Sequence, residues 1–193
     1  MSLSKAIPLD LSASLDLDLA DRHRYGDETA FDEIYVRFSP LVYNLCLRMS
    51  SDPQRAQDLS QDVFLRVYKG LRRFRGRSSL KTWIYRIAVN HCRSRLGRRR
   101  LLTEWLDPRV EANLPCDPSE GPEARAVVCD EERSVAEALG KLPAPFREAV
   151  VLRDLQGLTY EEISEVLGVR VGTVRSRLFR GRQRLRGVLE GER

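Results

Sequence analysis

Apolar residues along the chain recur at intervals of three and four, which is the period of a helix that buries one face. The first stripe after Asp27 consists of Ala30, Phe31, Ile34, Tyr35 and Phe38. Pro40 is expected to end the first helix, and a second stripe of Leu41, Leu45 and Met49 ends near residues 50–53. The pattern predicts two helices in a hairpin. Residues 1–20 show no stable periodicity and are predicted to be a loose arm.

Two more helices are predicted before residue 100. The third starts around Pro53 and ends at Gly70, with apolar positions spaced four apart at Leu59, Val63, Val67 and Leu71. Three residues lie off that row and are predicted to be polar surface: Asp58, Gln61 and Asp62. The next helix runs from about Leu80 to Leu96. A loop over residues 72–79, RRFRGRSS, joins the two, because a glycine and two serines break the period there.

The fourth predicted helix carries a polar row. Arg86, Asn90 and Arg93 share one face at spacings of four and three, which suits contacts with phosphates and a base edge. Trp83 and Tyr85 flank the buried stripe of this helix. At least one of these two rings is expected in the core.

The helical period returns after an acidic stretch. Residues 101–133 hold nine acidic and three basic residues with a Pro-Ser-Glu-Gly-Pro cluster, which predicts a linker. One helix follows from Glu131, and another begins at Pro143 or Pro145 and ends at Gly157. A capping box of Thr159 and Glu162 then opens a short helix. A turn at Gly168 leads to a longer helix, the layout of a helix-turn-helix.

The last helix has two distinct sides when each residue is rotated by 100°. One side, predicted to face the core, holds Val174, Leu178, Gly181, Leu185 and Val188. The opposite side holds Gly172, Ser176, Phe179, Arg180 and Gln183, with Arg175, Arg182 and Arg186 on one flank and Arg177 and Arg184 on the other. Such a helix suits the major groove of DNA, because polar and aromatic tips meet base edges while arginines meet both phosphate walls.

The pattern as a whole predicts an all-α fold of two small helical domains joined by a flexible linker, with a helix-turn-helix in the C-terminal domain. The predicted bounds are 1–26 for the N-terminal arm, 27–100 for the first domain, 101–130 for the linker and 131–193 for the second domain.

Charge is distributed in blocks along the 193 residues. The net charge of +5 conceals +13 over residues 63–100, which contain no acidic residue, and +7 over residues 169–186. An ordinary soluble surface mixes both signs. Two basic blocks that contain aromatic rings therefore indicate two contacts with one polyanion, a nucleic acid. The acidic linker is not expected to lie on it.

Other functional classes receive little support. The carboxylates lie outside both basic blocks and the chain has only two histidines, so an enzyme such as a nuclease is not expected. His91 and the adjacent Cys92 would point about 100° apart on a helix, so we expect no metal site, and we expect no cofactor. The cysteines are Cys46, Cys92, Cys116 and Cys129; they form no Cys-x-x-Cys pair and are expected to be reduced thiols. No apolar run approaches the roughly 18 residues of a membrane helix, and the N-terminus lacks the apolar core of a signal peptide. A cytoplasmic protein is expected.

Five stretches carry a family resemblance. They are AFDEIYVRFSPLVYNL, DLSQDVFLRVYKGLRRFRG and TWIYRIAVNHCRSRL in the first block, and LPAPFREAVVLRDLQGLTYEEISEVLGV and VGTVRSRLFRGRQRL in the second. In this order and at this spacing the chain resembles a bacterial sigma factor of the two-domain extracytoplasmic-function type. It departs from the family pattern at Asp62, where Glu is commoner, at Arg170, where a small residue or Pro is usual, and at Gly181, where Ala is common.

The resemblance implies roles for matching positions. The segment that docks on the clamp helices of core RNA polymerase matches Asp58, Gln61, Asp62 and Phe64. The loop that captures a base flipped from the minus-10 promoter element matches Phe74 to Ser78, and Asn90 matches a residue near that base. The full expected minus-10 set is Phe74, Arg75, Gly76, Arg77, Ser78, Trp83, Tyr85, Arg86, Asn90 and Arg93. The expected minus-35 set is Arg170, Thr173, Arg175, Ser176, Arg177, Phe179, Arg180 and Gln183.

The expected function follows from these roles. The protein binds core RNA polymerase, directs it to promoter DNA and helps to open the duplex; the family also implies an anti-sigma factor as a partner. We expect no stable homo-oligomer. A linker of about 33 residues permits promoter elements ~50–70 Å apart but cannot enforce that distance, so the polymerase must fix the two domains. The alternative is a stand-alone helix-turn-helix regulator whose first domain serves for dimerisation.

Overall fold

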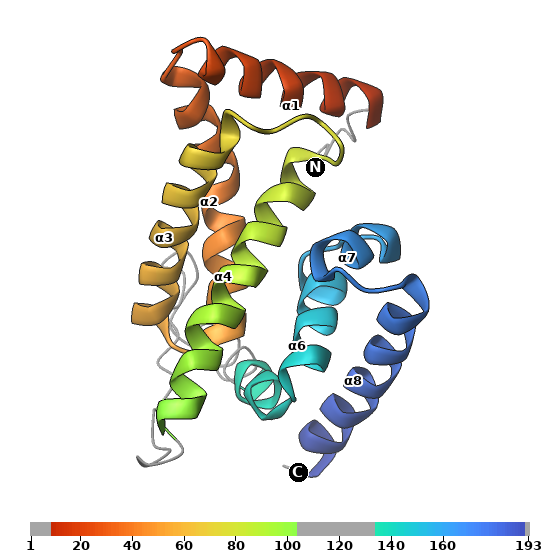
Figure 1. Ribbon diagram of the computed structural model, residues 1–193. Coiled ribbons are helices and arrows are strands. Elements are labelled where there is room, and N and C mark those ends of the chain that lie inside the picture. The colour runs from red at the N-terminus through yellow and green to blue at the C-terminus, as the bar shows by residue number, and fades with distance from the viewer. Residues whose placement is uncertain (1–8, 104–133, 192–193) are drawn as a thin grey trace, which may run out of the picture.

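A computed structural model describes residues 9–103 and 134–191, and the regular structure of these two ranges is entirely helical (Figure 1). The first range holds α1 (Leu9–Arg24), α2 (Thr29–Ser50), α3 (Pro53–Leu71) and α4 (Leu80–Thr103). The second holds a helix over residues 134–141, α6 (Ala144–Val150), a π-helical segment (Val151–Leu155), α7 (Tyr160–Leu167) and α8 (Val171–Gly191). The predicted all-α fold is confirmed for this part of the chain.

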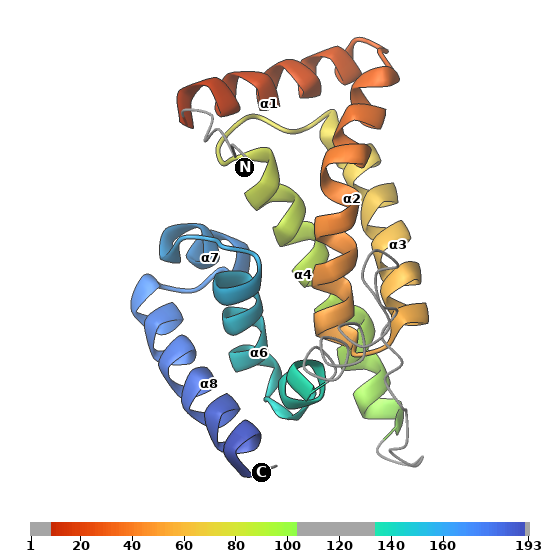
Figure 2. The ribbon, with the colours of Figure 1, turned by 180° about the vertical axis from the view of Figure 1, so that it is seen from behind.

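The first domain is a bundle of α2, α3 and α4 with α1 across one end. The two views, from front and back, show α2, α3 and α4 side by side (Figures 1 and 2). Ile34 and Phe38 from α2, Val63 from α3 and Ile84 from α4 are among the fully or almost fully buried side chains of the core. Asp52 caps α3, since its carboxylate accepts from the N–H of Arg55 at 3.1 Å.

The predicted hairpin around Pro40 is wrong, because α2 is one continuous helix that contains this proline. A proline inside a helix removes one backbone hydrogen bond and costs about 3 kcal/mol in an unsupported helix. The buried stripe nevertheless continues in phase from Phe38 to Val42 and Leu45, while Pro40 itself is exposed. Packing of that stripe against α3 and α4 stabilises the helix through the proline.

The predicted loose arm is also wrong for residues 9–24, which form α1. Its buried residues, Asp16, Leu19, Ala20 and His23, follow a helical spacing of three, one and three. Two of these four are polar, so the stripe is not recognisable from hydrophobicity alone. Leu19 and Ala20 join the core of the first domain.

In the second domain, α6 packs against α8, and α7 lies across one end of the pair (Figures 1 and 2). The predicted capping box is present: Thr159 Oγ1 accepts from Glu162 N at 3.2 Å, and Glu162 Oε2 accepts from Thr159 N at 2.8 Å. Gly168 ends α7 in the left-handed conformation at φ +66°. A Cβ on Gly181 would lie 2.8 Å from Val150 Cγ2, so this glycine permits the close approach of α8 to α6.

The two domains pack against each other mainly where α7 lies against α4, and α6 and the π-helical segment also contact α2 (Figure 1). Helix α4 extends to Thr103 and is therefore longer than predicted, because the sequence pattern ended it at Leu96. The predicted linker of residues 101–130 begins later than expected at its N-terminal end, and its positions from 104 onward lie outside the described residues.

Candidate nucleic-acid interface

The loop over residues 72–79 joins the end of α3 to the start of α4, as predicted. Arg75, Gly76 and Arg77 are exposed, and Ser78 is half-buried. Phe74 is only 4% exposed, and its ring packs on Trp83 with 5.3 Å between centroids. Phe74 therefore supports the loop from inside, and in this arrangement it presents no face on which a base can stack.

Helix α4 divides the expected minus-10 residues between two environments. Asn90 is exposed, and Arg86 and Trp83 are half-buried, which leaves these three accessible to DNA. Tyr85 is fully buried, and its hydroxyl donates to Gln156 Oε1 at 2.7 Å. Burial raises the pKa of the Tyr85 phenol, so it stays neutral. The expectation that one aromatic residue of this helix lies in the core is confirmed.

Arg93 is the second α4 residue that the other domain covers. Its Nε donates to Glu148 Oε1 at 2.7 Å and its Nη2 donates to Glu148 Oε2 at 2.5 Å. The hydrogen bonds that Arg93 donates to Glu148 raise the pKa of this guanidinium. Lys81 Nζ adds a bond to the carbonyl of Gln156 at 3.2 Å. Arg93 and Tyr85 thus bind the second domain here, a role that their spacing on α4 does not reveal.

Helix α8 presents its predicted faces. Val174, Leu178 and Gly181 are buried, whereas Ser176, Phe179, Arg180 and Gln183 are exposed. Arg170 and Arg175 are also exposed, and Thr173 and Arg177 are half-buried. The Phe179 ring is 64% exposed. Such exposure is unusual for a phenylalanine, because this residue type is mostly buried in folded proteins. The amphipathic assignment of this helix is therefore confirmed, and the outward side is free to enter a groove.

The arginines on one flank of α8 include two, Arg182 and Arg175, with partners within the domain. Arg182 donates two hydrogen bonds to the Asp154 carboxylate in an ion pair, and these bonds raise the pKa of the guanidinium. Arg175 lies over the ring of Tyr160, 5.9 Å from its centroid. These contacts orient the side chains beside a depression lined by Tyr160, Arg175, Leu178, Phe179, Arg182, Gln183 and Arg186.

The expected polymerase surface on α3 is only partly as predicted. Asp58 and Gln61 are exposed. Asp62 is half-buried, since its Oδ2 accepts from Arg95 at 2.6 Å and lies 3.1 Å from His91 Nε2. The hydrogen bond from Arg95 lowers the pKa of Asp62, and burial lowers the pKa of His91. Asp62, which was predicted to be polar surface, remains 34% exposed, and its partners Arg95 and His91 lie on α4.

An apolar groove lies next to Gln61, and sequence reasoning missed it. Its lining residues come from α2 and α3: Phe31, Tyr35, Gln61, Phe64, Leu65 and Tyr68. Phe64 is buried at its base, with its ring 4.8 Å from that of Tyr35, while Leu65 is 60% exposed. The signal that was available is that Leu65 falls outside the four-residue row of α3, so an apolar side chain is left on the surface.

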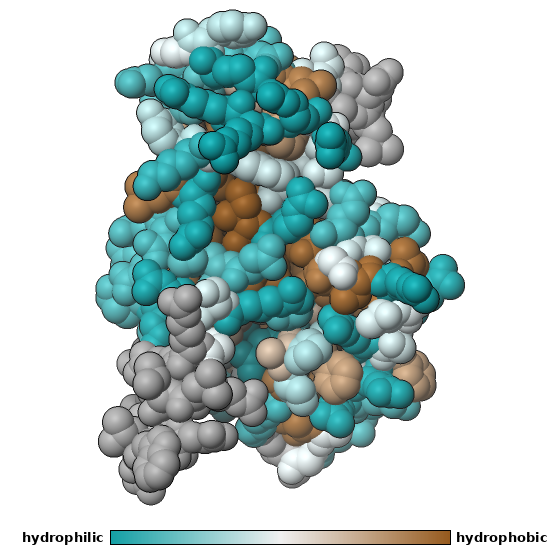
Figure 3. Space-filling view, in the orientation of Figure 1, coloured by the Kyte–Doolittle hydropathy of each residue, from teal (hydrophilic) through white to brown (hydrophobic). Residues whose placement is uncertain are grey.

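Other chemistry is sparse in the residues that the structure describes. No group of three or more His, Cys, Asp or Glu side chains converges there to hold a metal ion. Cys46 and Cys92 lie together in the core with 3.8 Å between sulfurs; the hydrogen bond with Cys92 and burial raise the pKa of the Cys46 thiol. None of the helices in residues 9–103 and 134–191 combines the length and apolarity needed to cross a bilayer. Hydrophilic residues cover most of the face in Figure 3 and hydrophobic residues appear in patches between them.

Two family models match the chain. The model of sigma-70 region 2 matches residues 34–101, and that of sigma-70 region 4 matches residues 132–185. The first match covers most of α2, all of α3 and the 72–79 loop, and most of α4, and the second covers the helix-turn-helix. The first basic block, residues 63–100, falls within the first match, and the second match covers the other block up to residue 185.

Relatives of known identity match over most of their length. The chain is 37% identical over 187 residues to the RNA polymerase sigma-H factor of Pseudomonas aeruginosa, covering 93% of this chain and 96% of the relative. It is 35% identical to the ECF RNA polymerase sigma-E factor of Escherichia coli, covering 87% and 91%, and 32% identical to the ECF sigma factor SigW of Bacillus subtilis, covering 85% and 91%.

Two solved structures of sigma factors have a similar fold. The sigma factor RpoE of Bartonella quintana, in complex with the anti-sigma factor NepR, matches with a TM-score of 0.68 at 25% identity, covering 84% of this chain and 98% of that one. CnrH, in complex with the cytosolic domain of CnrY, shares the fold with a TM-score of 0.68 at 24% identity, covering 93% and 99%.

Proposed function

The chain belongs to the extracytoplasmic-function (ECF) sigma factors, which direct RNA polymerase to promoters, and we propose that its two domains recognise different promoter elements. The observation that carries the proposal is the presence of an exposed basic surface on each domain, at the 72–79 loop and on α8. One DNA molecule is contacted at both places. The chain makes or breaks no covalent bond in this role.

The first domain docks on the polymerase through α3. Asp58 and Gln61 supply exposed polar groups, and the adjacent groove with Tyr35, Leu65 and Tyr68 supplies apolar area. An apolar patch with a polar rim is the usual composition of a protein interface. Asp62 contributes through its ion pair with Arg95, which orients its carboxylate at the edge of this surface.

The minus-10 element binds the loop and the accessible flank of α4. Arg75 and Arg77 contact phosphates, Gly76 and Ser78 border the captured base, and Asn90 reads its edge. Arg86 and Trp83 extend the surface along α4. Phe74 acts as the support of this loop, and Tyr85 and Arg93 become available only when the second domain moves away.

The minus-35 element binds the outward side of α8. Ser176, Phe179, Arg180 and Gln183 face base edges in the major groove, and Arg175 and Arg177 contact phosphates on the two sides. Arg170 and Thr173, at the start of the helix, add phosphate contacts because backbone N–H groups and the positive end of the helix dipole are there.

Opening of the duplex follows from differential binding. Flipping a base out of the stack costs a few kcal/mol, and a stacking contact returns about 1–3 kcal/mol. The remaining free energy for opening comes from phosphate contacts by the basic block of residues 63–100 and from contacts with the polymerase. No bound nucleotide or metal ion is required for this step.

The packed arrangement of the two domains is the state from which binding starts. Promoter elements ~50–70 Å apart cannot both reach domains that are in direct contact, so the domains separate on the polymerase. The similar fold of a sigma factor held by an anti-sigma factor supports a partner of that class for this chain. Such a partner stabilises the packed state and keeps the protein, which acts in the cytoplasm, away from polymerase.

Transcription with purified components tests the proposal. Core polymerase supplemented with this chain is expected to start RNA at discrete sites in genomic DNA, and the mapped starts are expected to share upstream elements. Tight binding of the free chain to a promoter duplex, with no start-site activity on addition to core polymerase, would contradict it. The comparisons lend no support to the alternative of a stand-alone regulator.

A further inference from the structure

The 72–79 loop has few backbone bonds of its own. Phe74 N donates to Leu71 O at its beginning, and Trp83 N donates to Ser79 O at its end. Between them, residues 75–78 make no backbone-to-backbone hydrogen bond to any residue in the described ranges. The conformation of this segment therefore depends on the side chains packed around it.

Helix α1 holds both ends of the loop. Asp16 Oδ2 accepts from Leu80 N, the first N–H of α4, at 2.8 Å, and the Asp16 side chain is only 4% exposed. Arg24 donates from Nε to Arg72 O at 3.1 Å and from Nη2 to Phe74 O at 3.0 Å. Figures 1 and 2 show the loop running beneath α1 from the end of α3 to the start of α4.

The middle of the loop also rests on α1. Gly76 has a backbone φ of +67°, a conformation that residues with a side chain rarely adopt. A Cβ at this position would lie 2.5 Å from Leu17 Cδ2, so Leu17 occupies the space of the missing side chain. The contact places the exposed turn of the loop at a fixed height above the core.

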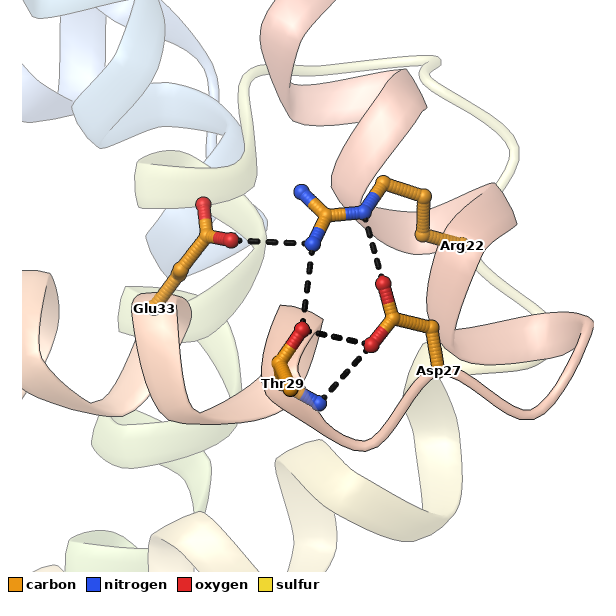
Figure 4. A network of polar contacts seen from close by, with 4 residues as sticks. All are labelled: Arg22, Asp27, Thr29 and Glu33. Carbon is orange, nitrogen blue, oxygen red and sulfur yellow. Dashed lines mark hydrogen bonds and ion pairs between the residues drawn. The ribbon is translucent and has the colours of Figure 1, made fainter.

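Helix α1 is in turn fixed to α2 by a network at the turn between them (Figure 4). Arg22 donates to Asp27 at 2.8 Å, to Thr29 Oγ1 at 3.2 Å and to Glu33 at 2.9 Å. Thr29 N donates to Asp27 Oδ1 at 3.0 Å. The contacts set the angle between the two helices, and α1 can therefore act as a rigid support.

We propose that α1 is a positioning element for promoter opening, in which Asp16, Leu17 and Arg24 hold the 72–79 loop in its base-capturing shape before DNA arrives. The inference rests on the proposed function of the loop. A loop that is ordered in the free protein loses less conformational freedom when it binds, and its shape excludes bases that do not fit. Residues that never touch DNA thereby influence both melting and base choice.

The test compares Asp16→Ala with Asp18→Ala in the full chain. Both changes remove one negative charge from α1, but Asp18 is exposed and has no part in the contacts above. By charge alone each variant would bind DNA slightly better. Positioning predicts the opposite for Asp16→Ala: open-complex formation by its polymerase holoenzyme falls about tenfold, and the preference for the correct base at the captured position falls at least about threefold.

Two further measurements separate positioning from loss of fold or of function. Thermal unfolding and affinity for core polymerase are expected to show that Asp16→Ala is folded and bound. The ¹⁵N order parameters of residues 75–78 are expected to fall from about 0.85 to below 0.6 in Asp16→Ala and to be unchanged in Asp18→Ala. If Asp16→Ala does not fold, Leu17→Ala carries the same test, because this side chain is 39% exposed.

The outcomes are distinguishable. Unchanged order parameters, or base preference equal to that of Asp18→Ala, would overturn the proposal even where transcription works. If the wild-type chain starts no transcription but the loop still becomes disordered in Asp16→Ala, the proposed function is overturned. The role of α1 as the support of the loop would then stand. Lower order parameters of the loop together with lost base preference in Asp16→Ala support both the positioning role of α1 and the proposed function.

Discussion

Arg93 of α4 and Glu148 of α6 form a two-bond ion pair that joins the two domains, with N–O distances of 2.7 and 2.5 Å. The Glu148 side chain is 3% exposed, and that of Arg93 is 34% exposed. A buried carboxylate is costly without its partner. This pair consequently makes the packed arrangement sensitive to a single side chain.

Glu148→Gln is expected to weaken domain packing without unfolding either domain. The change removes one charge-assisted pair, worth about 1–3 kcal/mol, and leaves no buried carboxylate behind, while the partly exposed Arg93 keeps its charge. Small-angle scattering is expected to show a larger radius of gyration, and polymerase binding is expected to be faster because the domains separate more easily. Glu165→Gln, an exposed carboxylate on α7, is the matched control. Equal radii for the two variants would show that the pair does not hold the domains together.

The outward side chains of α8 are expected to fall into two groups, those that contact base edges and those that contact phosphates. Arg180 is fully outward, so Arg180→Ala is expected to weaken minus-35 elements selectively by about 1–3 kcal/mol. Arg177 lies on a flank and is half-buried, so Arg177→Ala is expected to weaken all sequences alike and to lower the salt dependence of binding. Holoenzyme affinity for matched and mutated promoters at several salt concentrations measures both. Identical losses across promoters for the two variants would contradict the assignment of faces.

Sequence reasoning succeeded where burial is set within one element. The orientation of α8 follows from a 100° rotation per residue, and the buried Val174, Leu178 and Gly181 agree with it. The capping box of Thr159 and Glu162 is likewise local, since all of its atoms lie within one turn. In both cases the physical cause acts over three to four residues.

It failed where the partner lies far away in sequence. Asp16 is buried because the N–H of Leu80 lies opposite it, 64 residues away, and Asp62 is paired because Arg95 is on a neighbouring helix. Tyr85 is buried, and its hydroxyl donates to Gln156 of the other domain, 71 residues away. Pro40 misled for a related reason: tertiary packing stabilises a helix that local rules would end.

The polymerase surface is tested best at Asp58. Asp58→Arg is expected to lower affinity for core polymerase at least about tenfold, which corresponds to about 1.4 kcal/mol, because Asp58 is exposed and its replacement reverses the charge of the surface. Asp62→Arg is less informative, since it also breaks the pair with Arg95 and places a cation beside His91. Glu161→Arg on α7 controls for the change of net charge. Undiminished affinity of Asp58→Arg would remove this part of α3 from the interface.

His91 is expected to make the folded state sensitive to mild acid. Burial lowers its pKa in the folded protein, and the nearby Arg66 acts in the same direction. The unfolded chain, with an ordinary histidine pKa near 6.5, therefore binds the proton more readily, so stability is present above that pH and is lost as the pH falls. Asp62 titrates below this range. Urea unfolding at pH 7.5 and 5.5 is expected to show a smaller loss for His91→Gln than for the wild type, because His23 is common to both; equal losses would show that His91 is not the group responsible.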